Sequence, residues 1–444
     1  MQRKEKNILI IGFGETGKSI GNFLNSRNVN IYFWDDNKDI LNKPTNLFLK
    51  YSNQNIGFFD EIYVSPGISK NHYLIKAALK KNINILSDVE IFLNILNKKN
   101  KKNRLIAITG TNGKSTIALM IAKMLRVKAL ANFGNLVLSN IPKSKEDIVL
   151  ELSSFQLEYL NKIKPKVAII SNIKEDHLSY HGSFENYLKS KVKISKFQGK
   201  HDYLILNYDD ENLNKYFGNS KEFKSKIIWV SSKSKIKNGI SFLNNILVDN
   251  RFEKNSLEIK NSNFLKQGHN KLNFAISYAT LRCLKVKSKE IINTLTKFKG
   301  LPHRLELIGS INNIKFYNDS KATNVSATCS ALKGFNKVFL IAGGSKKGAT
   351  FKTLIKYLDK IAGIYLIGET AEEIKKVLGS NCSSFICKGL EEAVKKSYKK
   401  SLNSKKKFPI LLSPACASFD QYNNYQSRGD HFRTIFEKIS YGLQ

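Results

Sequence analysis

The chain has 444 residues and a formal net charge of +37 at pH 7, and this length predicts about two to four domains that each bury a core. The five cysteines are irregularly spaced, which excludes a disulfide framework and favours a reduced cytoplasmic protein. No apolar run approaches the roughly 20 residues of a membrane span, which excludes membrane insertion. Only nine of the 73 basic residues are arginines and the lysines are spread along the chain, so we expect a compositional bias and no nucleic-acid partner.

The N-terminal part of the chain alternates short apolar strands with helical stretches. Strands are predicted at Asn7–Ile11, Asn30–Trp34, Ile62–Val64 and Ile83–Leu86, and helices at Gly17–Ser26 and Tyr73–Lys80. This rhythm predicts a parallel sheet with ligands at the carboxyl ends of its strands. Residues 12–17 fit the pattern GxGxxG and Asp35 ends the second strand, so a NAD-dependent oxidoreductase remains an alternative.

Two breaks divide the rest of the chain. A polar run at Asn97–Asn103 reads as a linker, and Phe298–Pro302 interrupts the pattern again. Between them we expect strands at Leu105–Thr109, Ile148–Leu150, Val167–Ile170 and Tyr203–Leu206, a hairpin-rich stretch around Lys221–Ser262 and a helix after Asn270. Later strands are predicted at Lys337–Ala342, Ile364–Ile367 and Pro409–Leu412. We therefore expect an α/β protein of three domains, at residues 1–96, 97–299 and 300–444, each a mainly parallel sheet flanked by helices.

The strongest chemical signal is the loop from Gly110 to Ser115, which follows an apolar strand and opens a helical run. Backbone N–H groups at such a helix start favour phosphate. Lys114 is suited to the β- and γ-phosphates, and the hydroxyls of Ser115 and Thr116 are suited to Mg²⁺. The sequence therefore predicts an ATP-binding loop, although Ile108 replaces the first glycine of the usual GxxxxGK[ST] pattern.

Two further segments follow predicted strands. Glu151 ends an apolar strand, where its carboxylate either faces solvent or binds a metal ion. The phosphate loop upstream favours the interpretation as a metal ligand. His177, after the next strand, is either a loop residue or a metal and substrate contact. Lys191 has the pattern of an ordinary exposed helix lysine. Polar loops at Leu301–Glu306, Asn318–Asn324 and Ser413–Asp420 carry more functional groups than turns require.

These motifs together resemble the Mur ligase family, and in particular its D-glutamate-adding branch, from Ile10 to about Phe432. The resemblance implies a Rossmann-like N-terminal domain, a P-loop-type central ATPase and a Rossmann-like C-terminal domain. It also implies an ATP-dependent carboxylate–amine ligase of peptidoglycan synthesis. ATP would phosphorylate the carboxylate of UDP-N-acetylmuramoyl-L-alanine, and the amine of D-glutamate would attack the acyl phosphate. We expect a monomer.

The resemblance also assigns roles to individual residues. Those implied to be catalytic are Lys114, His177 and Lys191. Two Mg²⁺ ions are implied, one of them through a carbamylated Lys191, with metal contacts from Ser115, Thr116, Glu151, His177 and Lys191. ATP contacts are implied for Gly110, Thr111, Asn112, Gly113, Lys114, Ser115, Thr116, Asn270, Asn273, Arg304 and Asp319.

Substrate contacts are implied at both ends of the chain. The UDP side is assigned to Glu15, Thr16, Asp35, Ser65 and Asn132. The D-glutamate side is assigned to Lys321, Thr323, Lys347, Ser418, Phe419 and Tyr422, with Lys346 as an alternative to Lys347. Another Mur ligase or a folylpolyglutamate synthase remains a related alternative, and the oxidoreductase and a basic nucleic-acid-binding module are alternatives of other classes.

Overall fold

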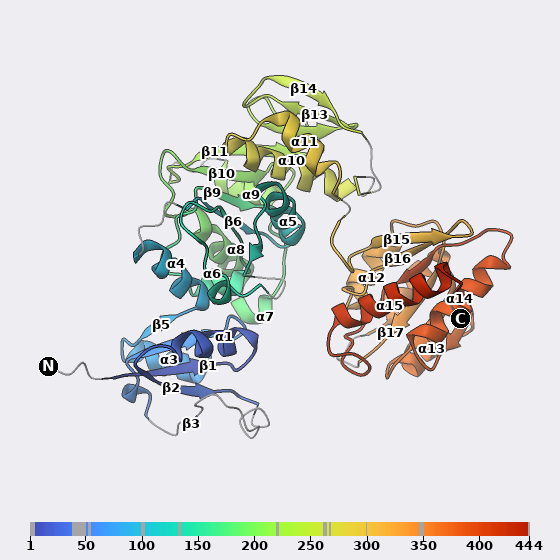
Figure 1. Ribbon diagram of the computed structural model, residues 1–444, viewed down its shortest axis with the longest axis horizontal. Helices are drawn as coiled ribbons and strands as arrows, with labels where there is room; N and C mark the ends of the chain where they lie inside the picture. Colours follow the sequence, from blue (N-terminus) through green and yellow to red (C-terminus); the bar gives the residue numbers. More distant parts are fainter. Residues whose placement is uncertain are drawn as a thin grey trace. The chain divides into compact units, whose positions relative to one another are not determined.

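The computed structural model describes residues 5–37, 50–51, 55–98, 103–131, 135–218, 222–260, 264–265, 268–298, 300–345 and 350–442. The predicted site residues Asn132 and Lys347, and Lys346 as the alternative to Lys347, lie outside these ranges. The chain divides into two compact units, Met1–Phe298 and Lys299–Gln444. Three sheets with helices against them make up these units, as Figure 1 shows, and this confirms the α/β prediction with mainly parallel sheets. No helix in the described part of the chain is both long and apolar enough to cross a membrane.

The first sheet of unit 1 has the strand order β3-β2-β1-β4-β5, and all its pairings are parallel. Its strands are β1 (Lys6–Ile11), β2 (Val29–Trp34), β3 (Lys50–Tyr51), β4 (Glu61–Val64) and β5 (Asn84–Leu86). Its helices are α1 (Glu15–Leu24), η1 (Ile56–Phe58), α3 (Tyr73–Lys80) and α4 (Asp88–Lys98). The first helix begins two residues before the predicted Gly17, because the GxGxxG loop leads directly into it.

The second sheet of unit 1 has nine strands in the order β14-β13-β12-β11-β10-β9-β6-β8-β7. They are β6 (Leu105–Thr109), β7 (Ala129–Leu130), β8 (Ile148–Glu151), β9 (Val167–Ile170), β10 (Tyr203–Asn207), β11 (Lys226–Ser231), β12 (Ile240–Leu243), β13 (Ile246–Asp249) and β14 (Asn255–Glu258). The predicted hairpin-rich stretch is correct for β12 to β14, which pair antiparallel. It is wrong for β11, which continues the parallel sheet beside β10.

Helices cover both faces of this second sheet. They are α5 (Lys114–Leu125), η2 (Val137–Ser139), α6 (Ser154–Glu158), α7 (Leu178–His181), α8 (Phe184–Val192), η3 (Lys193–Ser195), α9 (Glu211–Phe217), α10 (Gly268–Cys283) and α11 (Ser288–Leu295). Side chains alternate along β6, so Ile106 and Ile108 join the core under α5 and α10, whereas Ala107 faces the opposite core. That opposite core also contains Ile10 and Phe33 of the first sheet, so one apolar cluster is shared by both sheets of unit 1.

Unit 2 is built on a six-stranded sheet in the order β15-β16-β20-β17-β18-β19, parallel except for the β15–β16 pair. Its strands are β15 (Glu306–Ile311), β16 (Ile314–Asn318), β17 (Val338–Gly343), β18 (Ile361–Ile367), β19 (Ser384–Ile386) and β20 (Ile410–Leu412). Its helices are α12 (Val325–Leu332), η4 (Lys352–Lys360), α13 (Ala371–Leu378), η5 (Gly379–Asn381), α14 (Leu390–Leu402) and α15 (Tyr425–Ser440). Because β16, β20 and β17 are neighbours, the loops after them meet at one edge.

The first residue of α4 makes the stability of the protein depend on pH. Asp88 is 3% exposed, and burial raises its pKa from 3.8 to about 6. The folded state therefore keeps a proton that the unfolded chain has lost, and this contribution to stability falls as pH rises from about 4 to 6. Asp88→Asn should match the wild type near pH 4 and exceed it by up to about 3 kcal/mol above pH 7. Urea unfolding across this pH range measures the difference, and a difference that is constant with pH would contradict it.

Candidate active site

The loop between β6 and α5 depends on two glycines that adopt backbone angles unsuited to other residues. Gly110 has φ +145° and Gly113 has φ +84°. A Cβ on Gly110 would lie 2.0 Å from the Ser171 hydroxyl oxygen, and a Cβ on Gly113 would lie 2.6 Å from the Asn273 side-chain oxygen. Asn172 fixes the loop from the other side, because its backbone carbonyl accepts from the N–H of Thr111 and its side-chain oxygen accepts from the N–H of Asn112, both at 2.9 Å.

Lys114 follows this loop as the first residue of α5. Its ammonium group donates to the carbonyl oxygens of Gly110 at 2.9 Å and Thr111 at 3.0 Å. The cation is therefore folded back over the loop that it follows. A positive charge held beside the N-terminus of a helix is suited to an anionic phosphate.

A hydroxyl and a carboxylate meet next to the lysine. Ser115 donates to a carboxylate oxygen of Glu151 at 3.0 Å, and the two residues are 4% and 1% exposed. Glu151 ends β8, which pairs with β6, so the two groups lie at the same edge of the sheet. Thr116 is buried on the same turn of α5. Hydroxyl and carboxylate oxygens are hard ligands of the kind that Mg²⁺ binds.

Lys191 is not the exposed helix lysine that its sequence pattern suggested. It lies on α8, is 2% exposed and donates to the carbonyl of Gly110 at 2.9 Å, with its ammonium group 4.7 Å from the centre of the Tyr187 ring. Burial, and then the charge of Lys114, lower its pKa to about 6, against the opposing influence of Asp176 and Glu151. The side chain is therefore mostly an uncharged amine at neutral pH.

Two histidines bracket the short helix α7. His177 precedes it with φ +52° and is half-exposed, with its ring 4.8 Å from that of Phe155. His181, which the sequence did not single out, is buried at the other end of α7. Its Nε2 lies 3.0 Å from the Ser154 hydroxyl and its Nδ1 lies 3.4 Å from the Glu158 carboxylate. Burial lowers the pKa of His181, which favours the neutral ring, and its two contacts link α7 to α6.

The asparagines of α10 lie beside the phosphate loop. Asn270 and Asn273 are 3% and 4% exposed, and the side-chain nitrogen of Asn273 donates to the side-chain oxygen of Asn270 at 3.2 Å. The closeness of Asn273 to Gly113 brings this helix against the loop. The predicted ATP residues of unit 1 therefore come from the loop after β6, from α5 and from α10.

The predicted residues of the N-terminal sheet converge on the loop after β1. The backbone N–H of Phe13 donates to the Asp35 carboxylate at 2.7 Å, and the Ser65 hydroxyl donates to the carbonyl of Gly12 at 2.8 Å. Glu15 and Thr16 begin α1, the first exposed and the second partly buried. All four residues therefore lie at the carboxyl edge of the first sheet, where parallel sheets bind ligands.

The two predicted ATP residues of unit 2 are Arg304, near the start of the unit, and Asp319, directly after β16. Asp319 is 6% exposed and accepts from the Ser413 hydroxyl at 2.8 Å and from the N–H of Leu305 at 3.0 Å. Burial raises its pKa to about 7, although its hydrogen bonds and the charge of Arg304 act in the opposite direction. Arg304 itself is exposed, which leaves its guanidinium accessible to a ligand.

The structure separates the predicted D-glutamate residues into two groups. The ammonium group of Lys321 lies 5.7 Å from the centre of the Tyr425 ring, an aromatic residue that the sequence did not single out. Thr323 is two residues away, and its N–H donates to the carbonyl of Lys321. The sequence offers no signal that separates Tyr425 from Tyr422, because both follow the same small-residue loop.

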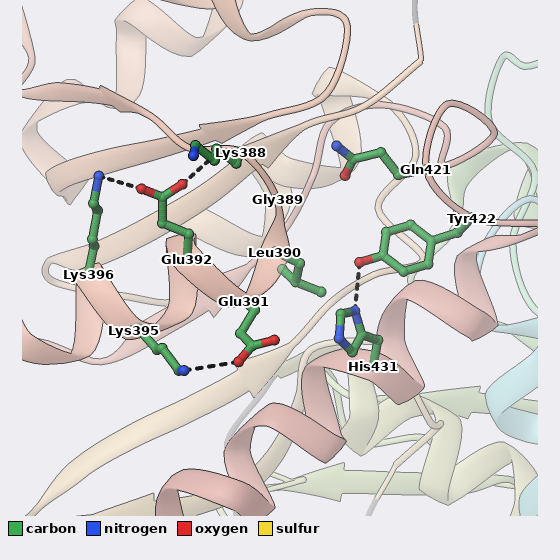
Figure 2. A pocket seen from close by; sticks show the side chains of 10 residues that line it. All are labelled: Lys388, Gly389, Leu390, Glu391, Glu392, Lys395, Lys396, Gln421, Tyr422 and His431. Atoms are coloured by element: carbon green, nitrogen blue, oxygen red, sulfur yellow. Dashed lines mark hydrogen bonds and ion pairs between the residues drawn. The ribbon is translucent and has the colours of Figure 1, made fainter. Parts of the chain in front are cut away.

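Tyr422 belongs to the second group. Its hydroxyl lies 2.8 Å from Nδ1 of His431 and lines a cavity of about 680 Å³ beside the start of α14, which Figure 2 shows. Its backbone N–H donates to the carbonyl of Ser418, which is buried, whereas the side chain of Phe419 is 64% exposed. The structure therefore places Tyr425, and not Tyr422, beside the lysine.

Models of protein families match three successive parts of the chain. They are a Mur ligase MurD-like N-terminal domain at residues 6–87, a Mur ligase middle domain at residues 108–312 and a Mur ligase glutamate ligase domain at residues 303–416. A protein of Rickettsia bellii (strain RML369-C), named UDP-N-acetylmuramoylalanine–D-glutamate ligase, is 35% identical over 98% of this chain and 98% of its own. The chain belongs to the Mur ligase family.

A further relative supports this assignment, and two solved structures share the fold. A protein of the same name from Wolbachia pipientis wMel is 31% identical over 99% of this chain and 97% of its own. Among solved structures, the MurF ligase of Thermotoga maritima in complex with ADP has a TM-score of 0.58 at 16% identity and covers 100% of this chain and 97% of its own. UDP-N-acetylmuramate–alanine ligase MurC from the same organism has a TM-score of 0.55 at 17% identity, covering 98% and 100%.

Membership of the Mur ligase family confirms the prediction of an ATP-dependent ligase of peptidoglycan synthesis, because its members form amide bonds with ATP and Mg²⁺. It favours this reading over the oxidoreductase and the nucleic-acid-binding module. The predicted domain boundaries and the roles of individual residues stay predictions.

Proposed function

We propose that the chain joins D-glutamate to the L-alanyl carboxylate of UDP-N-acetylmuramoyl-L-alanine, with ATP converted to ADP and phosphate. The observation that carries this proposal is the similarity, over nearly the whole chain, to relatives that bear the name of this D-glutamate ligase. The γ-phosphoryl group passes to the carboxylate, the amine of D-glutamate attacks the resulting acyl phosphate, and phosphate leaves. Since both substrates and ATP are anionic, the positive charge of the chain favours their approach.

The residues of the phosphate loop fit ATP. The helix start at Lys114, the glycine backbone and the ammonium group provide a positive cradle, and Asn270 and Asn273 lie against it. We assign Arg304 and Asp319 of unit 2 to ATP as well. Lys114 neutralises charge on the phosphates as the phosphoryl group is transferred.

The donor set around Ser115 and Glu151 fits one Mg²⁺ ion together with phosphate oxygens and water. No three His, Cys, Asp or Glu side chains come together as a metal site among the described residues. A second Mg²⁺ ion therefore needs another anion, and we assign this role to a carbamate on Lys191 with His177 nearby. Bound Mg²⁺ would supply charge stabilisation for phosphoryl transfer.

The state of Lys191 supports the carbamate. Carbon dioxide reacts with a neutral amine: the Lys191 nitrogen forms a bond to carbon, one proton leaves to water, and a carbamate anion remains. A pKa of about 6 keeps most of the amine neutral at pH 7.5, whereas an ordinary lysine would be almost entirely protonated. Burial, which lowers this pKa, also excludes the water that would otherwise compete for the site.

The two substrates are assigned to opposite ends of the chain. Glu15, Thr16, Asp35 and Ser65 hold the UDP side in the domain at residues 1–96. Lys321, Thr323, Ser418 and Phe419 hold D-glutamate in the domain at residues 300–444, and we add Tyr425 because of its contact with Lys321. We propose that ATP binds in the domain at residues 97–299. We also propose that the enzyme acts as a monomer in the cytoplasm, where ATP and a nucleotide-linked sugar are both present.

The proposal is tested by adding amino acids one at a time to the purified chain with ATP, Mg²⁺ and UDP-N-acetylmuramoyl-L-alanine. Phosphate release should require D-glutamate and match the amide product seen by mass spectrometry. L-glutamate, L-alanine and diaminopimelate serve as controls. Release with one of these instead would assign the chain to another Mur ligase, and glutamate addition to a folate would indicate a folylpolyglutamate synthase.

A further inference from the structure

Arg428 is a buried arginine that the activity described above does not use. It lies in the first turns of α15, is 1% exposed and is among the largest fully buried side chains of the protein. Its pKa falls to about 10 because of burial, so the guanidinium group still carries its charge at neutral pH. A buried cation is costly unless its surroundings hold it in place.

Neutral oxygen atoms surround this cation. Its Nε donates to the Ser320 hydroxyl at 3.0 Å and its Nη2 donates to the Ser320 carbonyl at 2.9 Å. Its Nη2 and Nη1 also donate to the carbonyls of Cys416 at 3.1 Å and Ala417 at 3.2 Å. No carboxylate among the described residues forms an ion pair with it, although the charge of Asp420 acts on it from farther away. Its positive charge is therefore held by dipoles and is not cancelled.

The oxygens belong to loops that follow neighbouring strands. Ser320 follows β16, and Cys416 and Ala417 follow β20. The loop after β17 leaves no room for a side chain beside the guanidinium group, because a Cβ on Gly344 would lie 3.2 Å from its Nη1 and 2.2 Å from the carbonyl oxygen of Ala417. One side chain therefore joins the loops after β16 and β20 by hydrogen bonds at the carboxyl edge of the sheet in unit 2.

These loops carry the residues assigned to the amino-acid substrate. Lys321 comes one residue after Ser320, and Ser418 comes one residue after Ala417. D-glutamate brings two carboxylates to this edge, and a fixed cation in a dry environment attracts them more strongly than one in water. Because a guanidinium group is planar and has five donors, a lysine at this position would keep the charge but not the set of bonds.

We propose that Arg428 is a positioning residue for the amino-acid substrate, which holds the loops after β16 and β20 in one arrangement and places an uncancelled positive charge behind them. This inference rests on the proposed function for the identity of the amino acid. A role limited to stability would lower the melting temperature and the active fraction without a selective effect on one substrate.

The test compares Arg428→Lys, Arg428→Gln and the control Arg433→Gln by steady-state kinetics with each substrate varied in turn. Arg433 lies on the same helix, but it pairs at the surface with Glu306 at 2.8 Å. In Arg428→Gln we expect the KM for D-glutamate to rise about thirtyfold, with the KM for ATP and for the UDP-substrate changed less than about twofold. Arg428→Lys should show a smaller rise, of about fivefold, because it keeps the charge. Arg433→Gln should match the wild type.

Several results would overturn the inference. They are an unchanged KM for D-glutamate in a folded Arg428 variant, equal changes for all three substrates, or a fall in kcat alone. If Arg428→Gln does not fold, Arg428→Lys and Ser320→Ala, which removes the acceptor of Nε, give the same selective readout. If the wild type uses a different amino acid, the proposed function fails, and the KM for that amino acid still tests Arg428.

Discussion

Lys114→Ala should lower ligase turnover by at least about a thousandfold while the protein stays folded. The ammonium group is held over the phosphate loop by the carbonyls of Gly110 and Thr111, and we propose that it meets the phosphates of ATP there. Without it, the charge that develops during phosphoryl transfer loses a fixed cation in a site with little water. Phosphate release at saturating substrates gives kcat, and far-ultraviolet circular dichroism with a thermal melt checks the fold.

A second lysine on the same helix is the control for this prediction. Lys123 is exposed on α5 and lies 5.8 Å from the centre of the Phe298 ring, away from the loop. Lys123→Ala should keep near-wild-type turnover, which would separate the loss of the phosphate contact from a general loss of positive charge. Near-normal activity in Lys114→Ala would remove the phosphate loop from the mechanism.

Lys191→Ala should be inactive, and short carboxylates such as formate or acetate should restore part of its activity. The truncation leaves a space beside Gly110 where the buried side chain was, and an added carboxylate can supply there the anion that we assign to the proposed carbamate. Turnover measured against carboxylate concentration should rise and saturate. In the wild type, ¹³C-labelled bicarbonate should give a carbamate signal by NMR that is missing in Lys191→Ala.

The matched control for Lys191 lies two residues earlier on α8. The side chain of Lys189 is 61% exposed and pairs with Glu185 at 2.7 Å, so Lys189→Ala should keep both the carbamate signal and the activity. Lowering the pH through about 6 protonates the Lys191 amine, so the carbamate signal of the wild type should fall in that range. Full activity of Lys191→Ala without added carboxylate would show that no carbamate is needed.

The sequence was sufficient for the fold because the signals that define it are local. The strand at Leu105–Thr109 and the helix at Tyr73–Lys80 have the predicted bounds, since apolar runs end there at glycine or polar residues. The strand β11 was missed as a member of the parallel sheet because its neighbour β10 lies in a separate stretch of the chain. Sheet pairing depends on contacts between distant residues, which a local pattern does not contain.

The burial and the direction of side chains in the site could likewise not be predicted from the local sequence pattern. Lys191 occurs in the lysine-rich stretch Lys189–Lys193, and only burial against Tyr187 and the phosphate loop makes it a neutral amine. Tyr422 and Tyr425 differ by three positions, yet one faces His431 and the other faces Lys321. The link that His181 makes needs α6, with Ser154 and Glu158, to meet α7, and neither helix identifies it alone.

The apolar cluster shared by the two sheets of unit 1 has a consequence for dissecting the protein. Ile10 and Phe33 of the first sheet belong to the same core as Leu150 and Ile170 of the second. A fragment cut in the segment between the sheets would expose this shared surface and would be prone to aggregate. The boundary after Phe298 leaves the cores of both pieces whole, so unit 2, to which we assign the amino-acid site, is the part best suited to separate expression, labelling and screening.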